Sequence, residues 1–172
     1  MKEITMLMAR YNQHANEQLF STLETLPEAG LTENSGSFFG SILNLMNHNL
    51  VASINWLNRF RHSHLPLPFL DTPVLDMVYP GFGKPLHTSL RDLWEHQRGV
   101  DELFIALTQA LTEPMLQQRV TYTDRTGQEL TRVVWQALIH LFNHQTHHRG
   151  QVSQVLDERG VENDFSAVSA LF

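Results

Sequence analysis

Apolar side chains recur every three or four positions along most of the chain, which is the spacing of helices with one buried face. Helix-ending and helix-capping residues divide the pattern: Pro27 ends the first segment, and Ser37 and Ser89 precede the second and third. Phe38 and Phe39 would then open the apolar face of the second helix. The pattern predicts four long helices, at residues 2–26, 37–61, 89–113 and 132–159.

Residues 62–87 interrupt the helical pattern with five prolines. Proline lacks the N–H that a helix interior needs and clashes with the preceding turn. We therefore expect a long loop between the second and third helices, which either runs along the bundle or folds over one end as the wall of a pocket. A tight turn is expected at 81–83, and His62, His64 and His87 are expected to be solvated.

Residues 119–131 alternate about a glycine-containing turn at 124–128, which predicts a short β-hairpin before the fourth helix. The last segment, 161–172, is half apolar and is expected to pack on the bundle or on a partner. The expected fold is all-α: a four-helix bundle in one domain spanning residues 1–172. The wide apolar surfaces of the second and fourth helices, together with this tail, also predict a homodimer with two-fold symmetry.

Four of the ten histidines fall within nine positions of the fourth predicted helix, at 140, 144, 147 and 148. At about 100° per residue, His144 and His148 lie within roughly 60° of Leu141 on the buried stripe. Imidazoles one turn apart can share one metal ion, which removes the cost of burying them without partners. The alternative is that they only fill polar gaps in the packing.

A third histidine stands inside a separate apolar helical run. His48 lies between Ile42 and Leu57, where a lone imidazole would otherwise lack a partner. His147 points away from the stripe by helical arithmetic. His140, one turn before His144, is either exposed or orients a metal ligand from behind.

These two stretches resemble the DinB (DinB/YfiT-like) family. The resemblance rests on Asn47-His48 with Trp56-Leu57 in the second helix, and on a run in the fourth: Asn143, His144, His147, His148, Arg149, Gly150 and Gln151. It implies the four-helix bundle of that superfamily, a divalent metal held by His48, His144 and His148, and frequent dimers. Ser53 departs from the pattern, because many relatives carry Asp there.

Composition excludes several classes of protein. The net charge of −6 and the pI near 5.9 argue against a protein that binds nucleic-acid backbones. There is no cysteine, so a metal must be held by nitrogen and oxygen. The first residues do not resemble a signal peptide and no apolar run is long enough to cross a bilayer, so we expect no membrane partner and a cytoplasmic protein.

Three neutral imidazoles leave at least one coordination position open for water or substrate. Zinc and nickel are the metals expected. The resemblance implies thiol-dependent transfer with a low-molecular-weight thiol as co-substrate. The alternatives are a metal-dependent hydrolase and a non-enzymatic metal- or ligand-binding module, and the sequence does not name the small-molecule substrate.

No catalytic residue is assigned by the sequence, and several neighbours leave two interpretations open. Tyr11 either reaches the metal or packs in the core. Arg149 either binds a substrate carboxylate or holds loop carbonyls, and the role of Gln151 is equally open. Asp101 is expected on a solvated face, although it and Gln97 lie close enough to the buried stripe to point inward.

Overall fold

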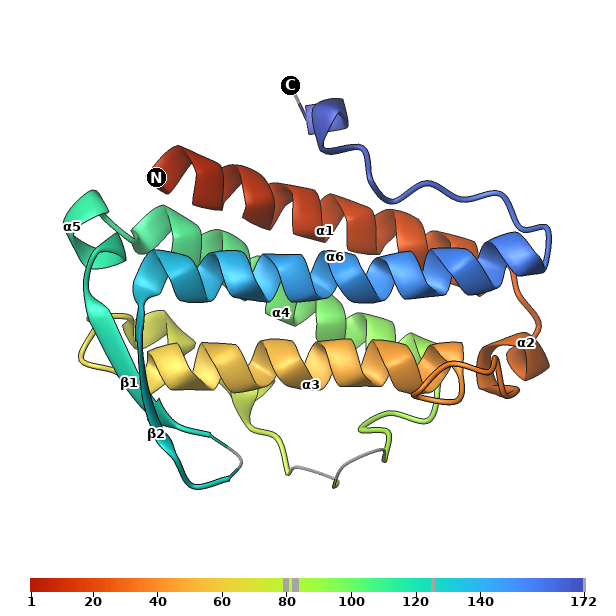
Figure 1. Cartoon of the computed structure of the whole chain (residues 1–172), viewed down its shortest axis with the longest axis horizontal. Helices are drawn as coiled ribbons and strands as arrows, with labels where there is room; N and C mark the ends of the chain where they lie inside the picture. The colour runs from red at the N-terminus through yellow and green to blue at the C-terminus, as the bar shows by residue number, and fades with distance from the viewer. Residues whose placement is uncertain (79–80, 82–83, 125, 172) are drawn as a thin grey trace.

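The computed structural model describes residues 1–78, 81, 84–124 and 126–171. Its four long helices form a bundle in which α1 and α3 each pack against both α4 and α6. Figure 1 shows α1 and α6 running in one direction and α3 and α4 in the other. The predicted all-α bundle is confirmed, with these bounds: α1 Lys2–Glu24, α3 Ile42–Arg61, α4 Leu90–Ala110 and α6 Val134–Glu158.

The start of the second long helix was predicted four residues too early. Ser41, not Ser37, is the N-cap of α3, and its side chain accepts a hydrogen bond from the backbone N–H of Asn44 at 3.2 Å. Gly36 and Gly40 before it have φ of 72° and 81°, a left-handed conformation that ends a helix rather than starting one. A short helix, α2 Glu28–Thr32, precedes this turn.

The loop after α3 runs along the bundle, because α3 and α4 are parallel and the chain must return to the same end (Figure 1). It contains two short 3₁₀ turns, η1 Pro68–Leu70 and η2 Pro73–Leu75. Of the turn predicted at 81–83, residues 82 and 83 lie outside the described residues, as does Pro80.

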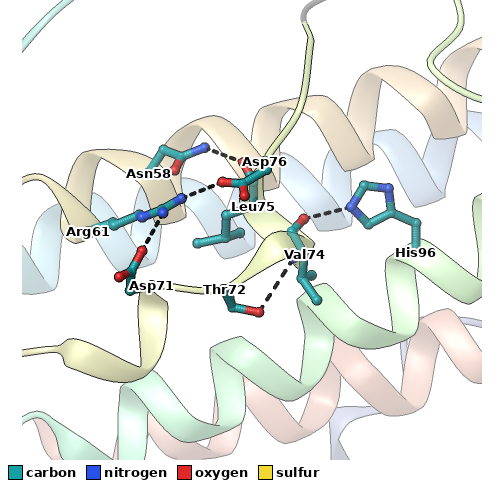
Figure 2. A network of polar contacts seen from close by, with 8 residues as sticks. All are labelled: Asn58, Arg61, Asp71, Thr72, Val74, Leu75, Asp76 and His96. Atoms are coloured by element: carbon teal, nitrogen blue, oxygen red, sulfur yellow. Dashed lines mark hydrogen bonds and ion pairs between the residues drawn. The ribbon is translucent and has the colours of Figure 1, made fainter.

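Polar contacts from both flanking helices hold this loop in place (Figure 2). From α3, the Arg61 guanidinium pairs with Asp71 at 2.5 Å and Asp76 at 2.8 Å. From α4, the Nε2–H of His96 donates to the carbonyl of Val74 at 2.8 Å. The segment at residues 71–76 of the long loop is thus bound to both α3 and α4.

The predicted hairpin is confirmed as β1 Arg119–Thr123 paired antiparallel with β2 Glu129–Val133. It follows a short helix, α5 Glu113–Leu116, and lies against the C-terminal part of α3 (Figure 1). The tail also packs on the bundle as predicted: Phe165 is buried, and the turn η3 Val168–Leu171 contacts α1. Within the described part of the chain, no helix combines the length and apolar character that crossing a bilayer requires.

Candidate metal centre

The side-by-side packing of α3 and α6 brings the three predicted histidines together. His48 lies in the first half of α3, and His144 and His148 stand one turn apart in the middle of α6. The Nε2 of His144 is 3.3 Å from that of His48 and 3.1 Å from that of His148. The ligand atoms of the three all lie within 4.8 Å of one another, so this group could hold a metal ion.

The protons of three neutral imidazoles cannot satisfy these contacts. His148 donates from Nδ1 to Oε1 of Gln151 at 2.7 Å, which leaves its Nε2 without a proton. If His144 carries a proton on Nε2, it can donate to only one of its two neighbours. If it does not, two lone pairs face each other at 3.1 Å. In both cases at least one of the two close contacts between nitrogens is not a hydrogen bond.

Two of the three separations between the nitrogens equal the spacing of neighbouring ligands around one ion, and the third is within 4.8 Å. Nitrogens about 2.05 Å from a tetrahedral zinc ion lie roughly 3.3 Å apart. The two measured separations, 3.1 and 3.3 Å, match this value. The group therefore fits a divalent cation better than it fits a hydrogen-bonded cluster.

Burial keeps these histidines neutral. Burial and, to a smaller extent, the neighbouring imidazoles together lower the pKa of His48 to about 4 and that of His144 to about 3. The pKa of His148 is lowered by burial as well, against the opposing effect of its hydrogen bond to Gln151. Neutral imidazole is the form that binds metal, so the triad is in its ligand form at neutral pH.

Phe39, which we predicted to lie in the second helix, covers one side of the triad. Phe39 stands before α3, and its ring stacks on that of His48 with centroids 4.3 Å apart and meets the ring of His148 edge-on at 5.6 Å. Its neighbour Phe38 is 79% exposed, so neither is part of an apolar helix face as predicted. Gly36 and Gly40, which flank these two aromatic residues, were the feature of the sequence that could have indicated a turn here.

Two further histidines of α6 stay outside the triad. His147 is exposed, as predicted, with its ring beside that of His148. His140 is also exposed and meets the indole of Trp56 at 5.7 Å, so it does not orient a ligand from behind. Gln151 instead makes the contact that such a role requires, because its Oε1 accepts from Nδ1–H of His148 at 2.7 Å.

Both interpretations of Arg149 are wrong. Its guanidinium is buried and donates to the side-chain oxygens of Asn12 at 2.6 Å and Asn16 at 3.1 Å, both on α1. It also lies over the ring of Tyr11 at 5.2 Å. Arg149 therefore joins α6 to α1 inside the bundle, and within the described part of the chain it contacts no loop carbonyl and does not line the cleft described below.

The solvated interpretation of Asp101 is wrong as well, and its inward alternative is the one observed. Asp101 is buried, and its carboxylate accepts from Asn12 at 2.9 Å, from Asn16 at 2.9 and 3.1 Å and from Gln97 at 3.0 Å. Burial raises its pKa to about 7, against the lowering effect of these hydrogen bonds and of the Arg149 cation. Asn12 and Asn16 thus bridge an acid on α4 and a cation on α6.

The core interpretation of Tyr11 is confirmed. Its ring is buried and its hydroxyl donates to the carbonyl of Phe165 at 2.7 Å, which fastens the C-terminal tail to α1. The hydroxyl therefore does not belong to the triad.

The loop histidines have different surroundings. His62 and His64 are exposed as predicted, but His87 is half-buried, with its Nε2 2.9 Å from Nδ1 of His96. The amide of Asn47 exchanges two hydrogen bonds with the backbone of His87, at 2.8 and 2.9 Å. The residue before His48 thus anchors the end of the long loop.

Ser53, which departs from the resembled pattern, also has a structural role. Its buried hydroxyl accepts from Nε2 of Gln145 on α6 at 2.6 Å. It therefore helps to hold α3 against α6 beside the triad.

A cleft of about 780 Å³ reaches the triad from the surface. His48 lines it at one end, and the C-terminal part of α3 and strand β1 line the rest, with Arg59 and Tyr122 among the lining residues. A small molecule in this cleft would touch one imidazole of the triad.

Comparison with known proteins shows that the similarity to the DinB family covers most of the chain. The model of the DinB family matches residues 1–166. Protein DinB of Bacillus subtilis (strain 168) is 22% identical over 165 residues, covering 93% of this chain and 88% of that protein. A crystal structure of a DinB-like protein from Bacillus cereus ATCC 10987 shares the fold, with a TM-score of 0.54 and 21% identity over 87% of this chain and 90% of that one.

Proposed function

Because this chain belongs to the DinB family, we propose that it is a metal-dependent enzyme in which His48, His144 and His148 hold one divalent ion. The observation that carries the proposal is the convergence of three neutral imidazoles whose protons cannot satisfy their contacts. A cation among them would turn a repulsive arrangement of lone pairs into a ligand set.

Zinc and nickel are the metals we propose. Imidazole nitrogen suits both ions, and the order of affinities does not choose between them because the metal recovered depends on supply. Three protein ligands are typical of catalytic zinc sites, which keep a position for water or substrate, whereas structural sites usually have four. Among the described residues, no carboxylate joins the three histidines as a fourth ligand. This supports an open site.

The reaction we propose is thiol-dependent transfer, with a low-molecular-weight thiol as co-substrate. When bound, the ion would supply a Lewis acid that lowers the pKa of a thiol or water, or polarises a carbonyl. His48 faces the cleft, so a co-substrate would approach from the side of α3. Phe39 shields His48 and His148 from water on the side it covers, and Gln151 holds the His148 ring in its ligand orientation.

The ligand set is tested by metal content. We expect purified protein to carry about one divalent ion per chain by plasma mass spectrometry, and His48→Ala, His144→Ala and His148→Ala to lose most of it while keeping the helical circular dichroism. His147→Ala and His62→Ala are matched controls and should bind normally. Full occupancy without His48, or equal loss from His147→Ala, would show that other imidazoles are the ligands.

The reaction class is tested on metal-loaded protein. Consumption of a thiol together with an electrophile, abolished by His48→Ala, is the expected result. Turnover of an ester or amide with water alone would replace transfer with hydrolysis, for which the same open site would serve.

A purely structural metal predicts a different outcome. In that case chelation would unfold the protein, because the ion's binding energy would be part of its folding energy. We expect the chelated protein to remain helical, since the buried core of the bundle extends well beyond the triad.

A further inference from the structure

The cleft follows one stripe of α3 from the triad towards the end of the helix. Asn55, Arg59 and His62 follow His48 by 7, 11 and 14 positions and also line the cleft. At about 100° per residue, all three lie within roughly 40° of His48 around the helix axis. Short side chains, Val51 and Ala52, line the part between His48 and Asn55. The stripe therefore forms the long wall of an elongated cleft.

Arg59 is the cation of this wall. Its guanidinium carbon lies 4.3 Å from the ring centroid of Trp56 and 4.1 Å from that of Tyr122. Such cation–π contacts hold the guanidinium in place and leave the N–H groups along its edge to donate to a ligand. Among the described residues, none accepts a hydrogen bond from this guanidinium or forms an ion pair with it, and its contacts are with the two rings. Burial lowers the pKa of Arg59, while Tyr122 and Asp124 raise it, so a partly desolvated cation faces the cleft.

The hairpin supplies the opposite rim. Tyr122 projects from β1 onto Arg59, and Asp124 follows at the end of the strand. Oδ1 of Asp124 accepts from the backbone N–H groups of Thr126 and Gln128, at 2.8 and 3.0 Å, so this oxygen serves the turn of the hairpin. A cation with one acid near it suits a singly charged ligand better than a polyanion.

The distance between Arg59 and His48 sets the size of the ligand. Eleven residues of helix rise about 16 Å. A molecule that engages both groups must therefore be elongated.

We propose that this cleft binds an elongated small molecule carrying a carboxylate, which Arg59 holds by its guanidinium edge while the opposite end of the molecule reaches the His48, His144 and His148 triad. The inference rests on the proposed function, because it assigns the cleft to the thiol co-substrate. Trp56 and Tyr122 position Arg59, and Val51 and Ala52 leave room for the chain of the ligand.

The test measures binding of three probes to the zinc-loaded full chain by titration calorimetry. The probes are a mercapto-tetra(ethylene glycol) carboxylic acid, the matching alcohol, and 3-mercaptopropionate, which is too short to join the two ends of the cleft. We expect the long acid to bind about tenfold more tightly than its alcohol, the effect of one hydrogen bond to a charged group. The advantage of the long acid should disappear in Arg59→Gln, and 3-mercaptopropionate should bind the two proteins equally.

Two further variants show whether a loss of binding comes from the cleft and not from damage to the fold. Arg98→Gln is the matched control, because Arg98 also lies over a tryptophan, Trp94 at 5.9 Å, but on α4 and outside the cleft lining. Asn55→Asp changes an exposed side chain and removes no contact with Arg59, and its negative charge should weaken the long acid and not the alcohol.

The outcomes separate this inference from the proposed function. Equal affinity for the long acid and alcohol in the wild-type protein, or an advantage that survives Arg59→Gln, overturns the carboxylate site and leaves thiol binding intact. Failure of all three thiols to bind overturns the thiol function, and this inference with it.

Discussion

The buried network around Arg149 offers the sharpest test of a structural role that the sequence did not predict. Arg149→Met removes the guanidinium and keeps an unbranched side chain of similar length. The side-chain oxygens of Asn12 and Asn16 then lose their donor, and Asp101 loses the cation that lowers its pKa. If the side chain instead served a substrate carboxylate, its removal would leave the fold unaffected.

The expected loss of folding stability is large because the side chains of the network are buried. Removing one partner of a buried charge network costs about 3–5 kcal/mol, a large part of the ~5–15 kcal/mol by which domains are usually stable. For a chain of this size each kcal/mol shifts Tm by about 2–4 °C, so we expect a fall of roughly 6–20 °C.

The pH dependence of this loss is a second signature. The pKa of Asp101, about 7 in the folded protein, lies above its ordinary value of 3.8. A raised folded-state pKa contributes stability that is complete below the unfolded pKa and is lost as the pH rises through the folded one. Without Arg149 the folded pKa should rise further, so Arg149→Met should be more destabilising at pH 8 than at pH 6.

Thermal denaturation followed by circular dichroism at both pH values measures these effects, with chelator present so that metal binding does not contribute. Arg91→Met is the matched control, because Arg91 is exposed on α4. In a double-mutant cycle with Asp101→Asn, the two losses should not add, since both variants disrupt one network. A melting temperature within about 1 °C of the wild type would refute the structural role assigned to Arg149.

Three further predictions concern the triad and the assembly. Gln151→Leu should weaken metal binding by about 10–100-fold, measured by competition with a fluorescent chelator; an unchanged affinity would show that Gln151 does not orient His148. Metal-free protein should lose stability as the pH falls from 6.5 towards 4, because the pKa of His48 and of His144 is lowered in the folded state and the unfolded chain takes up protons first. In urea titrations, the unfolding free energy of the His48→Gln/His144→Gln double variant should fall less steeply over this pH range. An equally steep fall would contradict the assignment. Light scattering should give the mass of a homodimer, and a monomer mass that does not change with concentration would rule it out.

The sequence by itself determined the four long helices, the hairpin and the three histidines that meet. Helical periodicity places His144 and His148 on one face of α6, and the resemblance to the DinB family implied that His48 joins them. The structure brings the three together. These features are local, because they depend on angles around a single helix axis and on caps and turns a few residues long. That the triad holds metal stays a prediction.

Only the tertiary structure decided the roles of the polar residues around the triad. Arg149 meets side chains from 133 and 137 positions away, and Asp101 meets some of the same ones from 85 and 89 positions away. Periodicity around α6 or α4 cannot show that α1 presents two asparagines to both, so neither charge had a visible partner in the sequence. The contact between Phe39 and His148 and the cleft beside Arg59 also depend on tertiary structure, because each forms where segments distant in the sequence pack together.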